Sequence, residues 1–204
     1  MKNKIIAVIG AGGKTTLIHR LAEEYRRKGA SVLVSTTTHM LVEPDTDLSC
    51  DSFAVMEKIK KTGYCMAGAV CPENSAKMQS LPEQMLHDLM KQVDYALIEA
   101  DGAKHYALKY PSEQEPVIPE GTTDVILVLG SCDLGKPCKD VVFRFEHMTS
   151  ALGISGDMKA DKQMLQWIWQ AYEEKLKNMD YQGHFHVLLS EKTDQGLMFH
   201  TLEE

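Results

Sequence analysis

The twelve residues from Ile5 to Thr16 constrain the fold of this chain more than any other stretch. They read Ile-Ile-Ala-Val-Ile-Gly-Ala-Gly-Gly-Lys-Thr-Thr, an apolar run that breaks into glycines and then into a lysine and two threonines. Such an apolar run is typical of a buried strand. The glycines allow the backbone to turn sharply, so that several N–H groups can point at one anion. The segment therefore predicts a strand, a phosphate-binding loop and the start of a helix.

The helix is expected over residues 15–28, where apolar residues recur at helical spacing. The positive end of its dipole would point at the loop and strengthen an anion site there. Lys14 is expected to neutralise phosphate charge, and the Thr15 hydroxyl is expected to bind Mg²⁺. The residues predicted to hold the nucleotide in this loop are Gly10, Ala11, Gly12, Gly13, Lys14, Thr15 and Thr16.

The loop is shorter than the standard P-loop, which has a further glycine where this chain has Val8. The short form, Gly10-x-x-Gly13-Lys14-Thr15, resembles the nucleotide loop of the Mur ligases. The alternative is a glycine-rich turn between a strand and a helix that binds no ligand. A strand before the loop and an amphipathic helix after it favour nucleotide binding over that alternative.

A second apolar strand is predicted over residues 31–35 and completes a β-α-β unit. The strands of such a unit lie parallel in a sheet that binds ligands at the carboxyl ends of its strands. The run Thr36-Thr37-Thr38-His39 falls at that end. The Thr37 hydroxyl is a candidate magnesium ligand, and His39 is a candidate metal ligand or base. The alternatives are a solvated strand end with helix-capping threonines, and a loop histidine with neither role.

Two carboxylates stand at the end of a third apolar strand, over residues 95–99. Glu99 and Asp101 occupy the place of the acidic partner of a P-loop, where a carboxylate holds Mg²⁺ or positions the water that attacks a γ-phosphate. Asp101 is the predicted metal ligand, with Glu99 as the alternative. Lys104 follows at once and is expected to contact a phosphate or an anionic substrate. The competing interpretation is that the acidic residues cap the next loop and that Lys104 lies in a solvated surface loop.

Further helices are predicted over residues 56–61, 82–92 and 157–179, and further strands over 64–69, 124–130 and 184–189. The last strand leads into Ser190-Glu191-Lys192-Thr193-Asp194, which resembles the N-K-x-D base-recognition motif of GTPases with glutamate in place of asparagine. In that motif the lysine lies along the base and the aspartate accepts hydrogen bonds from guanine. Lys192 and Asp194 are therefore candidate base contacts, and the alternative is an ordinary turn between a strand and a helix.

Composition bounds the class of protein. A chain of 204 residues, 44% of them hydrophobic, is expected to form one domain spanning residues 1–204, with a lid at about 140–182. The formal net charge of −7 argues against nucleic-acid binding, which needs a basic face. No apolar run is long enough to span a membrane, and no signal-peptide pattern is present, so a cytoplasmic location is expected.

Five cysteines without a C-x-x-C pair argue against a disulfide framework. Cys65 and Cys71, like Cys132 and Cys138, are six positions apart, which suggests a metal site. Zinc-ligand pairs are usually closer together, so small buried cysteines are the preferred interpretation.

Four motifs in the same order resemble the YqeC family, which is described as accessory proteins of selenium-dependent molybdenum hydroxylases. The motifs are Gly10-Ala11-Gly12-Gly13-Lys14-Thr15-Thr16, Thr36-Thr37-Thr38-His39, Glu99-Ala100-Asp101-Gly102-Ala103-Lys104 and Glu115-Pro116-Val117-Ile118-Pro119. The resemblance implies a P-loop α/β fold, here a three-layer sandwich around a mostly parallel sheet. Family members tend to have His-Arg-Pro-Glu where this chain has Phe143-Arg144-Phe145-Glu146, so a histidine role is lost, while Arg144 keeps its cationic role.

Together these features predict a Mg²⁺-dependent protein that binds ATP or GTP, hydrolyses it, and acts in selenium cofactor biosynthesis or in maturation of a selenium-dependent molybdenum hydroxylase. The expected catalytic residues are Lys14, Glu99, Asp101, Lys104 and Arg144. Either of the last two cations would neutralise charge that develops during the reaction. One alternative is an ATP-dependent small-molecule kinase or ligase, as the Mur-like loop suggests. A second alternative is a nucleotide-switched chaperone of a metalloenzyme.

Overall fold

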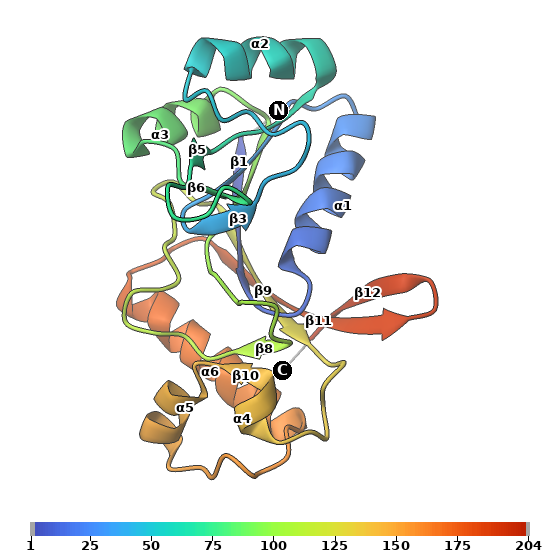
Figure 1. Ribbon diagram of the computed structural model, residues 1–204, viewed down its shortest axis with the longest axis vertical. Coiled ribbons are helices and arrows are strands. Elements are labelled where there is room, and N and C mark those ends of the chain that lie inside the picture. The colour runs from blue at the N-terminus through green and yellow to red at the C-terminus, as the bar shows by residue number, and fades with distance from the viewer. Residues whose placement is uncertain (1–2, 203–204) are drawn as a thin grey trace. The chain divides into compact units, whose positions relative to one another are not determined.

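The computed structural model describes residues 3–202 and shows a mixed α/β architecture (Figure 1). Seven strands form the central, mostly parallel sheet in the order β12-β11-β9-β1-β7-β2-β4. They are β1 (Lys4–Gly10), β2 (Val32–Thr36), β4 (Tyr64–Met66), β7 (Tyr95–Glu99), β9 (Asp124–Gly130), β11 (His184–Thr193) and β12 (Gly196–Thr201). The flanking helices are α1 (Lys14–Arg27), α2 (Ser52–Thr62), α3 (Glu83–Lys91), α4 (Cys138–Val141), α5 (Phe145–Leu152) and α6 (Lys162–Asn178). The predicted α/β sandwich with a mostly parallel sheet is confirmed.

Two small sheets were not expected from the sequence. One joins β3 (His39–Leu41), β6 (Lys77–Gln79) and β5 (Ala69–Val70) in that order, and the other pairs β8 (Leu108–Lys109) with β10 (Val142–Phe143). Residues 40–80 carry few apolar positions at strand spacing, so the short strands of the first sheet leave no clear periodic pattern.

The described residues divide into two compact units. The first contains residues 3–8, Thr15–Gly102 and Val117–Asp124, and the second contains Ile9–Lys14, Ala103–Pro116 and residues 125–202. The prediction of a single nucleotide-binding domain over residues 1–204 with a lid at about 140–182 stays a prediction. No helix within residues 3–202 is long and apolar enough to cross a membrane.

One face of the parallel strands in the first unit packs against α2 and α3. β1 and β2 each pair in parallel with β7, and β2 pairs in parallel with β4. The buried cluster that joins these strands to the two helices consists of Ile5, Leu33, Val55, Ile59, Cys65, Ala67, Leu81, Leu86, Leu89, Met90, Val93, Ala96 and Ile98. Both predicted helices pack on this cluster. The helix predicted at 56–61 is longer in the structure, where α2 spans Ser52–Thr62, and the helix predicted at 82–92 is one residue shorter at each end, where α3 spans Glu83–Lys91.

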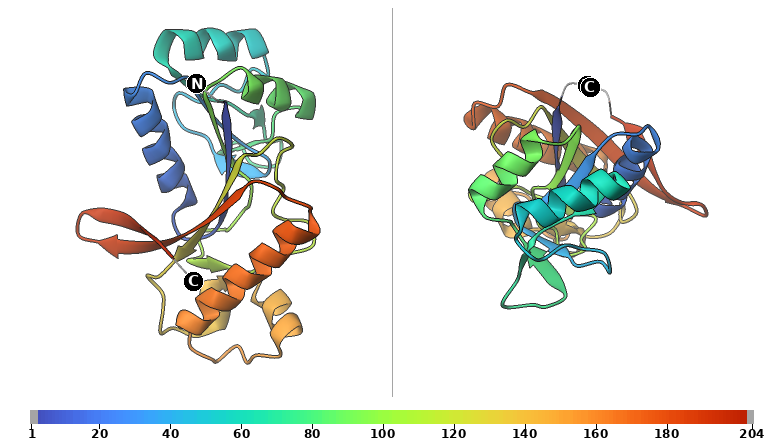
Figure 2. Two further views of the ribbon diagram at one scale, coloured as in Figure 1. Left: turned by 180° about the vertical axis from the view of Figure 1, so that it is seen from behind. Right: turned by 90° about the horizontal axis from the view of Figure 1, so that it is seen from above.

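The other face of β7 packs against α1. Tyr25 of α1 stacks on Tyr95 of β7 with ring centroids 3.7 Å apart and an interplanar angle of 10°. Side chains alternate along a strand, so Tyr95 and Glu99 point to this face while Ile98 points to the face of α3. Figure 2 shows α1 (blue) and α3 (green) on opposite sides of the strands of this unit. The first unit is therefore layered as helix, sheet and helix, with Glu99 facing α1.

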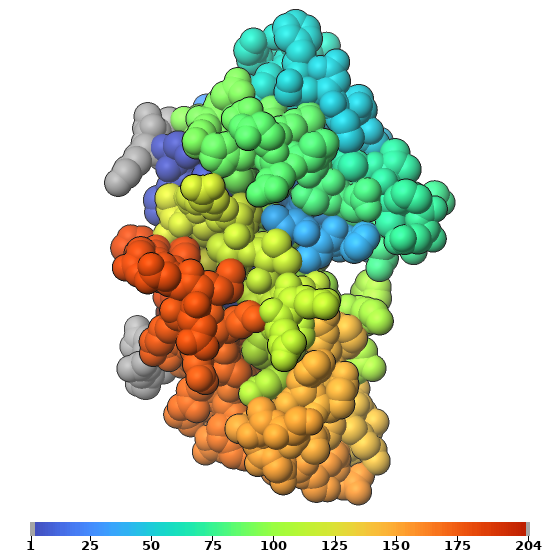
Figure 3. Space-filling model, turned by 90° about the vertical axis from the view of Figure 1, so that its left-hand side faces the viewer, coloured from blue at the N-terminus to red at the C-terminus, as the bar shows by residue number. Residues whose placement is uncertain are grey.

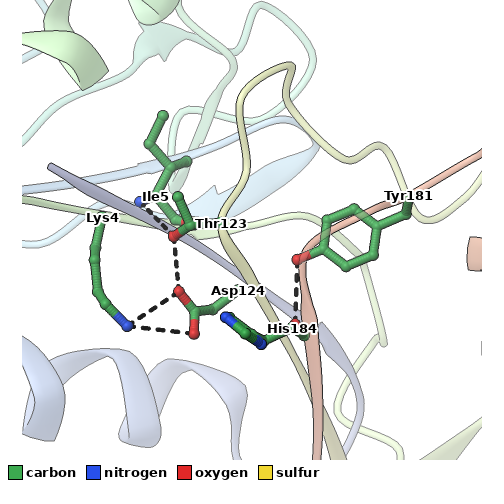
Figure 4. Close-up of polar contacts among 6 residues, drawn as sticks. All are labelled: Lys4, Ile5, Thr123, Asp124, Tyr181 and His184. Atoms are coloured by element: carbon green, nitrogen blue, oxygen red, sulfur yellow. Dashed lines mark hydrogen bonds and ion pairs between the residues drawn. The ribbon is translucent and has the colours of Figure 1, made fainter. Parts of the chain in front are cut away.

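A polar network fixes the start of β1 in the first unit (Figure 4). The Ile5 N–H donates to the Thr123 hydroxyl at 3.1 Å, and that hydroxyl donates to Asp124 at 2.7 Å. The Lys4 ammonium lies 3.4 Å from the same carboxylate. In the second unit, the Tyr181 hydroxyl donates to the His184 carbonyl at 3.1 Å, at the start of β11.

The C-terminal part differs from the sequence prediction in two places. The last strand does not end at Leu189, because β11 continues to Thr193 and turns tightly into antiparallel β12. The helix predicted from residue 157 begins at Lys162, where the side chain of Asp161 accepts a hydrogen bond from the Met164 N–H at 3.0 Å. An aspartate that caps a helix stabilises its first turn, and this cap fixes the helix start five residues later than the apolar pattern indicated.

Candidate nucleotide-binding site

The glycine loop joins β1 to α1 as the sequence predicts, and its backbone conformation requires glycine. Gly10, Gly12 and Gly13 have φ values of +84°, +83° and +138°, which L side chains rarely adopt. A Cβ on Gly10 would lie 2.3 Å from the Val128 carbonyl oxygen. A Cβ on Gly12 would lie 2.6 Å from the Ala107 carbonyl oxygen. The loop is therefore packed closely against other backbone of the second unit.

Lys14 lies folded over this loop. Its ammonium donates a hydrogen bond to the Gly10 carbonyl at 2.8 Å, and the residue is only 6% exposed. The Ser190 hydroxyl donates a hydrogen bond to the Gly12 carbonyl of the same loop. These two bonds hold the loop, and the first places the Lys14 ammonium beside it. The role of Lys14 in phosphate binding stays a prediction.

The Thr15 hydroxyl donates a hydrogen bond to the Glu99 carboxylate, with Oγ1 and Oε2 3.0 Å apart. Thr15 lies in the first turn of α1, and Glu99 ends β7 beside Val8 of β1. The parallel pairing of the two strands and the packing of α1 on β7 bring these residues together. A hydroxyl and a carboxylate are oxygen donors of the kind that Mg²⁺ prefers, so this donor set fits a magnesium ion.

The threonine run after β2 lies against the same end of β7. The Thr36 hydroxyl donates to the Glu99 carbonyl at 2.8 Å and accepts from the Thr38 N–H at 3.0 Å. The Thr37 N–H donates to that carbonyl at 3.1 Å, and the Thr37 hydroxyl donates to the Val117 carbonyl at 2.7 Å. The structure thus brings Thr37, Thr15 and Glu99 to one end of the first unit's strands, and the hydroxyls of both Thr36 and Thr37 donate to backbone carbonyls there.

Asp101 is fully buried two residues beyond the end of β7. The preceding residue, Ala100, is held on both sides, because its N–H donates to the Val8 carbonyl and its carbonyl accepts from the Val117 N–H, each at 3.0 Å. These bonds continue the backbone pairing of β7 past Glu99 and so fix the position of the Asp101 backbone. Both predicted carboxylates therefore lie at the carboxyl end of β7.

The predicted cation Arg144 belongs to a partly buried ion cluster in the second unit. Its guanidinium lies 2.8 Å from Oε2 of Glu115, and it also donates to the Ser112 hydroxyl. The same Glu115 oxygen accepts from the Lys109 ammonium at 2.6 Å, and Lys109 has no exposed surface. The sequence predicted that the lysines after the acidic pair, Lys109 included, contact a phosphate or an anionic substrate, with a solvated surface loop as the alternative. The burial of Lys109 contradicts the surface-loop alternative, and its position beside the apolar pair Ala107 and Leu108 was the available signal for burial.

Lys104 lies exposed in a backbone turn of unusual geometry. Lys104 and His105 both have positive φ, at 45° and 66°, which is uncommon for consecutive residues with side chains. The Lys104 ammonium lies 5.3 Å from the centre of the Phe143 ring, and Lys109 and Arg144 lie 5.6 and 5.3 Å from it. Three cations therefore lie close to the Phe143 ring.

The two predicted base contacts lie in the β-hairpin at the end of the chain. Lys192 pairs with Leu197 across the hairpin, and Asp194 lies in the turn, both exposed. The Thr193 hydroxyl donates to the Gly196 carbonyl at 2.8 Å and closes this turn. The segment forms a hairpin instead of a strand-to-helix turn, and base recognition by these residues stays a prediction.

The sequence model of the YqeC protein family matches residues 6–146. This chain belongs to the YqeC family. The match includes the glycine loop, the acidic end of β7 and the ion cluster around Arg144, and the predicted family is confirmed. An uncharacterised YqeC protein of Escherichia coli (strain K12) is 34% identical over 161 residues. The alignment covers 75% of this chain and 62% of that protein, so the chain spans less than two thirds of this relative. No solved structure matches the chain.

Proposed function

We propose that this YqeC-family chain binds ATP or GTP together with Mg²⁺ at the loop Gly10–Thr16 and hydrolyses the nucleotide. The contact between the Thr15 hydroxyl and the Glu99 carboxylate, 3.0 Å apart, is the observation that carries this proposal. This contact lies at the end of β7 and at the N-terminus of α1, and the glycine loop before α1 suits an anion. A turn that served only to connect a strand to a helix would need no such pair of oxygen donors.

Each residue of the proposed site has a distinct chemical role. Lys14, which lies over the loop, neutralises phosphate charge, and the N–H groups at the start of α1 donate hydrogen bonds to the phosphate oxygens. Thr15 and Glu99 hold the Mg²⁺, with Thr37 and Asp101 as further oxygen donors at the same strand ends. When bound, the ion withdraws charge from the phosphate oxygens. Asp101 or Glu99 orients the attacking water.

The biological role in the proposal comes from the family resemblance. We propose that nucleotide turnover serves selenium cofactor biosynthesis or maturation of a selenium-dependent molybdenum hydroxylase. The two rival functions make different products. A kinase or ligase yields a phosphorylated or ligated small molecule, whereas a hydrolase or a nucleotide-switched chaperone yields nucleoside diphosphate and phosphate. Stimulation of turnover by a client hydroxylase would favour the chaperone.

The magnesium part of the proposal is tested by measuring nucleotide affinity with Mg²⁺ and with a chelator. We expect Mg²⁺ to strengthen binding to the native protein, and Glu99→Gln or Thr15→Val to reduce that strengthening by about tenfold or more, the range typical for a disturbed metal shell. Glu83→Gln, an exposed carboxylate of α3 in the same unit, is the matched control and should behave as native. An equal effect of Mg²⁺ on native and Glu99→Gln protein would contradict the assignment of Glu99.

A further inference from the structure

His39, Cys71 and Glu73 lie together in the first unit, and none of them belongs to the proposed nucleotide site. Their ligand atoms, one each from the imidazole, the thiol and the carboxylate, all lie within 4.8 Å of one another. Cys71 is buried at 3% exposure, and the other two residues are exposed. The group therefore has one buried soft ligand and two exposed harder ligands.

The small sheet β3-β6-β5 explains how residues 32 positions apart meet. His39 and Ala69 both pair with Gln79, from opposite sides of β6. Residues directly opposite each other in a sheet share a face, so His39 and Ala69 lie on one face, and Cys71 directly follows the end of β5 at Val70. Figure 3 shows the segment of β3 (blue) next to the green segment that contains β5 and β6 at the surface.

A tight turn holds Cys71 and Glu73 at this end of β5. The Asn74 N–H donates to the Cys71 carbonyl at 3.2 Å, and Pro72 occupies the second position of the turn, where its ring fixes φ. The Asn74 side chain accepts from the Ala76 N–H at 3.0 Å and stabilises the far side. The thiol and the carboxylate are thus presented by a preformed loop.

We propose that His39, Cys71 and Glu73 bind a zinc ion. A thiolate, an imidazole and a carboxylate are ligands that zinc accepts together, whereas Mg²⁺ and Ca²⁺ take oxygen ligands. Bond lengths of about 2.0–2.3 Å in a tetrahedral site place ligand atoms roughly 3.3–3.8 Å apart. Movements of about 1 Å by the exposed imidazole and carboxylate close the difference. Three protein ligands leave the fourth position for water or an exogenous ligand.

The site lies directly after the threonine run, because His39 follows Thr38 in the chain. Zinc binding would therefore fix the start of β3 and with it the segment that carries Thr37. The ligands are distinct from those of the proposed nucleotide site, so the zinc proposal does not depend on nucleotide binding and can be tested without nucleotide.

Cobalt titration of the metal-free full chain tests the proposal, because Co²⁺ substitutes for Zn²⁺ and is coloured. We expect one Co²⁺ per chain, the intense visible bands of tetrahedral cobalt and a thiolate-to-cobalt charge-transfer band, all abolished by Zn²⁺. Cys71→Ser should remove the charge-transfer band. His39→Ala should weaken metal affinity by at least about tenfold, because even the loss of a residue that only supports a metal ligand weakens affinity by about that much.

Two controls separate a specific site from general thiol binding or from loss of fold. Cys50→Ser and Cys132→Ser remove exposed thiols elsewhere and should leave the spectrum unchanged. Cys71→Ser changes a buried side chain, so a lost signal in that variant could reflect misfolding. His39→Ala and Glu73→Gln change exposed side chains, where misfolding is not expected, and they test the same metal site. A charge-transfer band that survives in Cys71→Ser, or native affinity in both His39→Ala and Glu73→Gln, would overturn the zinc site.

Discussion

Glu115→Gln is predicted to destabilise the chain strongly, because it removes a carboxylate charge that is paired with both Lys109 and Arg144. One carboxylate oxygen lies 2.6 Å from the buried ammonium and 2.8 Å from the guanidinium. Each attraction is about 4 kcal/mol at an effective dielectric constant of about 20 and a charge separation of about 4 Å. Most of that is offset by the cost of taking the charges out of water.

Removing one partner of a buried pair costs about 3–5 kcal/mol, since the remaining charge stays buried. The glutamine keeps a hydrogen-bond acceptor, so we expect the lower end, about 3 kcal/mol, and a fall in melting temperature of roughly 6–12 °C for a chain of this size. Urea denaturation followed by circular dichroism measures the free energy of unfolding. Glu57→Gln, whose partner Lys60 is 2.9 Å away on the surface of α2, is the matched control and should change stability by well under about 1 kcal/mol.

If Glu115→Gln were as stable as Glu57→Gln, the Lys109 ammonium would not depend on the Glu115 carboxylate, contrary to this prediction. The experiment also bears on Arg144. If the arginine serves mainly this cluster, Arg144→Ala should lower stability and nucleotide turnover together. A loss of turnover with native stability would instead support the predicted catalytic role.

Three further outcomes are expected. Gly12→Ala should lower the free energy of unfolding in urea by roughly 3 kcal/mol, because the added Cβ meets backbone 2.6 Å away. Gly29→Ala has a similar φ but open space around it, so it should lower that free energy only by the backbone strain of about 1–2 kcal/mol. Equal losses in the two variants would contradict the close packing of the loop. Burial raises the pKa of Cys65 to about 11 from an ordinary value of 9.0, so the folded state holds this proton more tightly and this group's contribution to stability should fall as the pH rises from about 9 to about 11. At pH 8, Cys65 should resist alkylation while the exposed Cys50 reacts. Rapid labelling of Cys65, detected by mass spectrometry, would contradict its burial. Zn²⁺ at about 100 times its Kd should raise the free energy of unfolding of the native chain by about 2.7 kcal/mol and that of His39→Ala by much less, as thermal melting would show; equal shifts would contradict a site at His39.

The sequence predicted the elements that local patterns specify. The apolar run at Ile5, the glycine loop and the amphipathic residues after it follow rules that depend on neighbours in the chain, and β1 and α1 appear where expected. The meeting of Thr15 with the end of β7 also follows, because parallel strands place their carboxyl ends at one edge. The sequence did not predict which of the two carboxylates bonds to Thr15, since that depends on which face of β7 packs against α1.

Features that depend on contacts between distant residues were missed. Lys109 is an ordinary lysine until the fold brings Glu115 and Arg144 to it, and the short strands of the β3-β6-β5 sheet are stabilised by pairing more than by their own composition. The cysteine spacing directed attention to Cys65 and Cys71 as a pair, whereas Cys71 lies beside His39. The strand extension to Thr193 was missed because its polar residues read as a turn, although pairing with β12 satisfies their backbone.

Nucleotide binding at the glycine loop is tested by calorimetric titration of the purified native chain and of Lys14→Ala with Mg·ATP and with Mg·GTP. We expect at least one nucleotide to bind to the native protein and Lys14→Ala to lose most of this affinity, since the ammonium that lies over the loop would meet the phosphates. The nucleotide that binds more tightly identifies the preferred base. Absence of binding by both nucleotides at millimolar concentration, or native affinity in Lys14→Ala, would contradict a phosphate site at this loop.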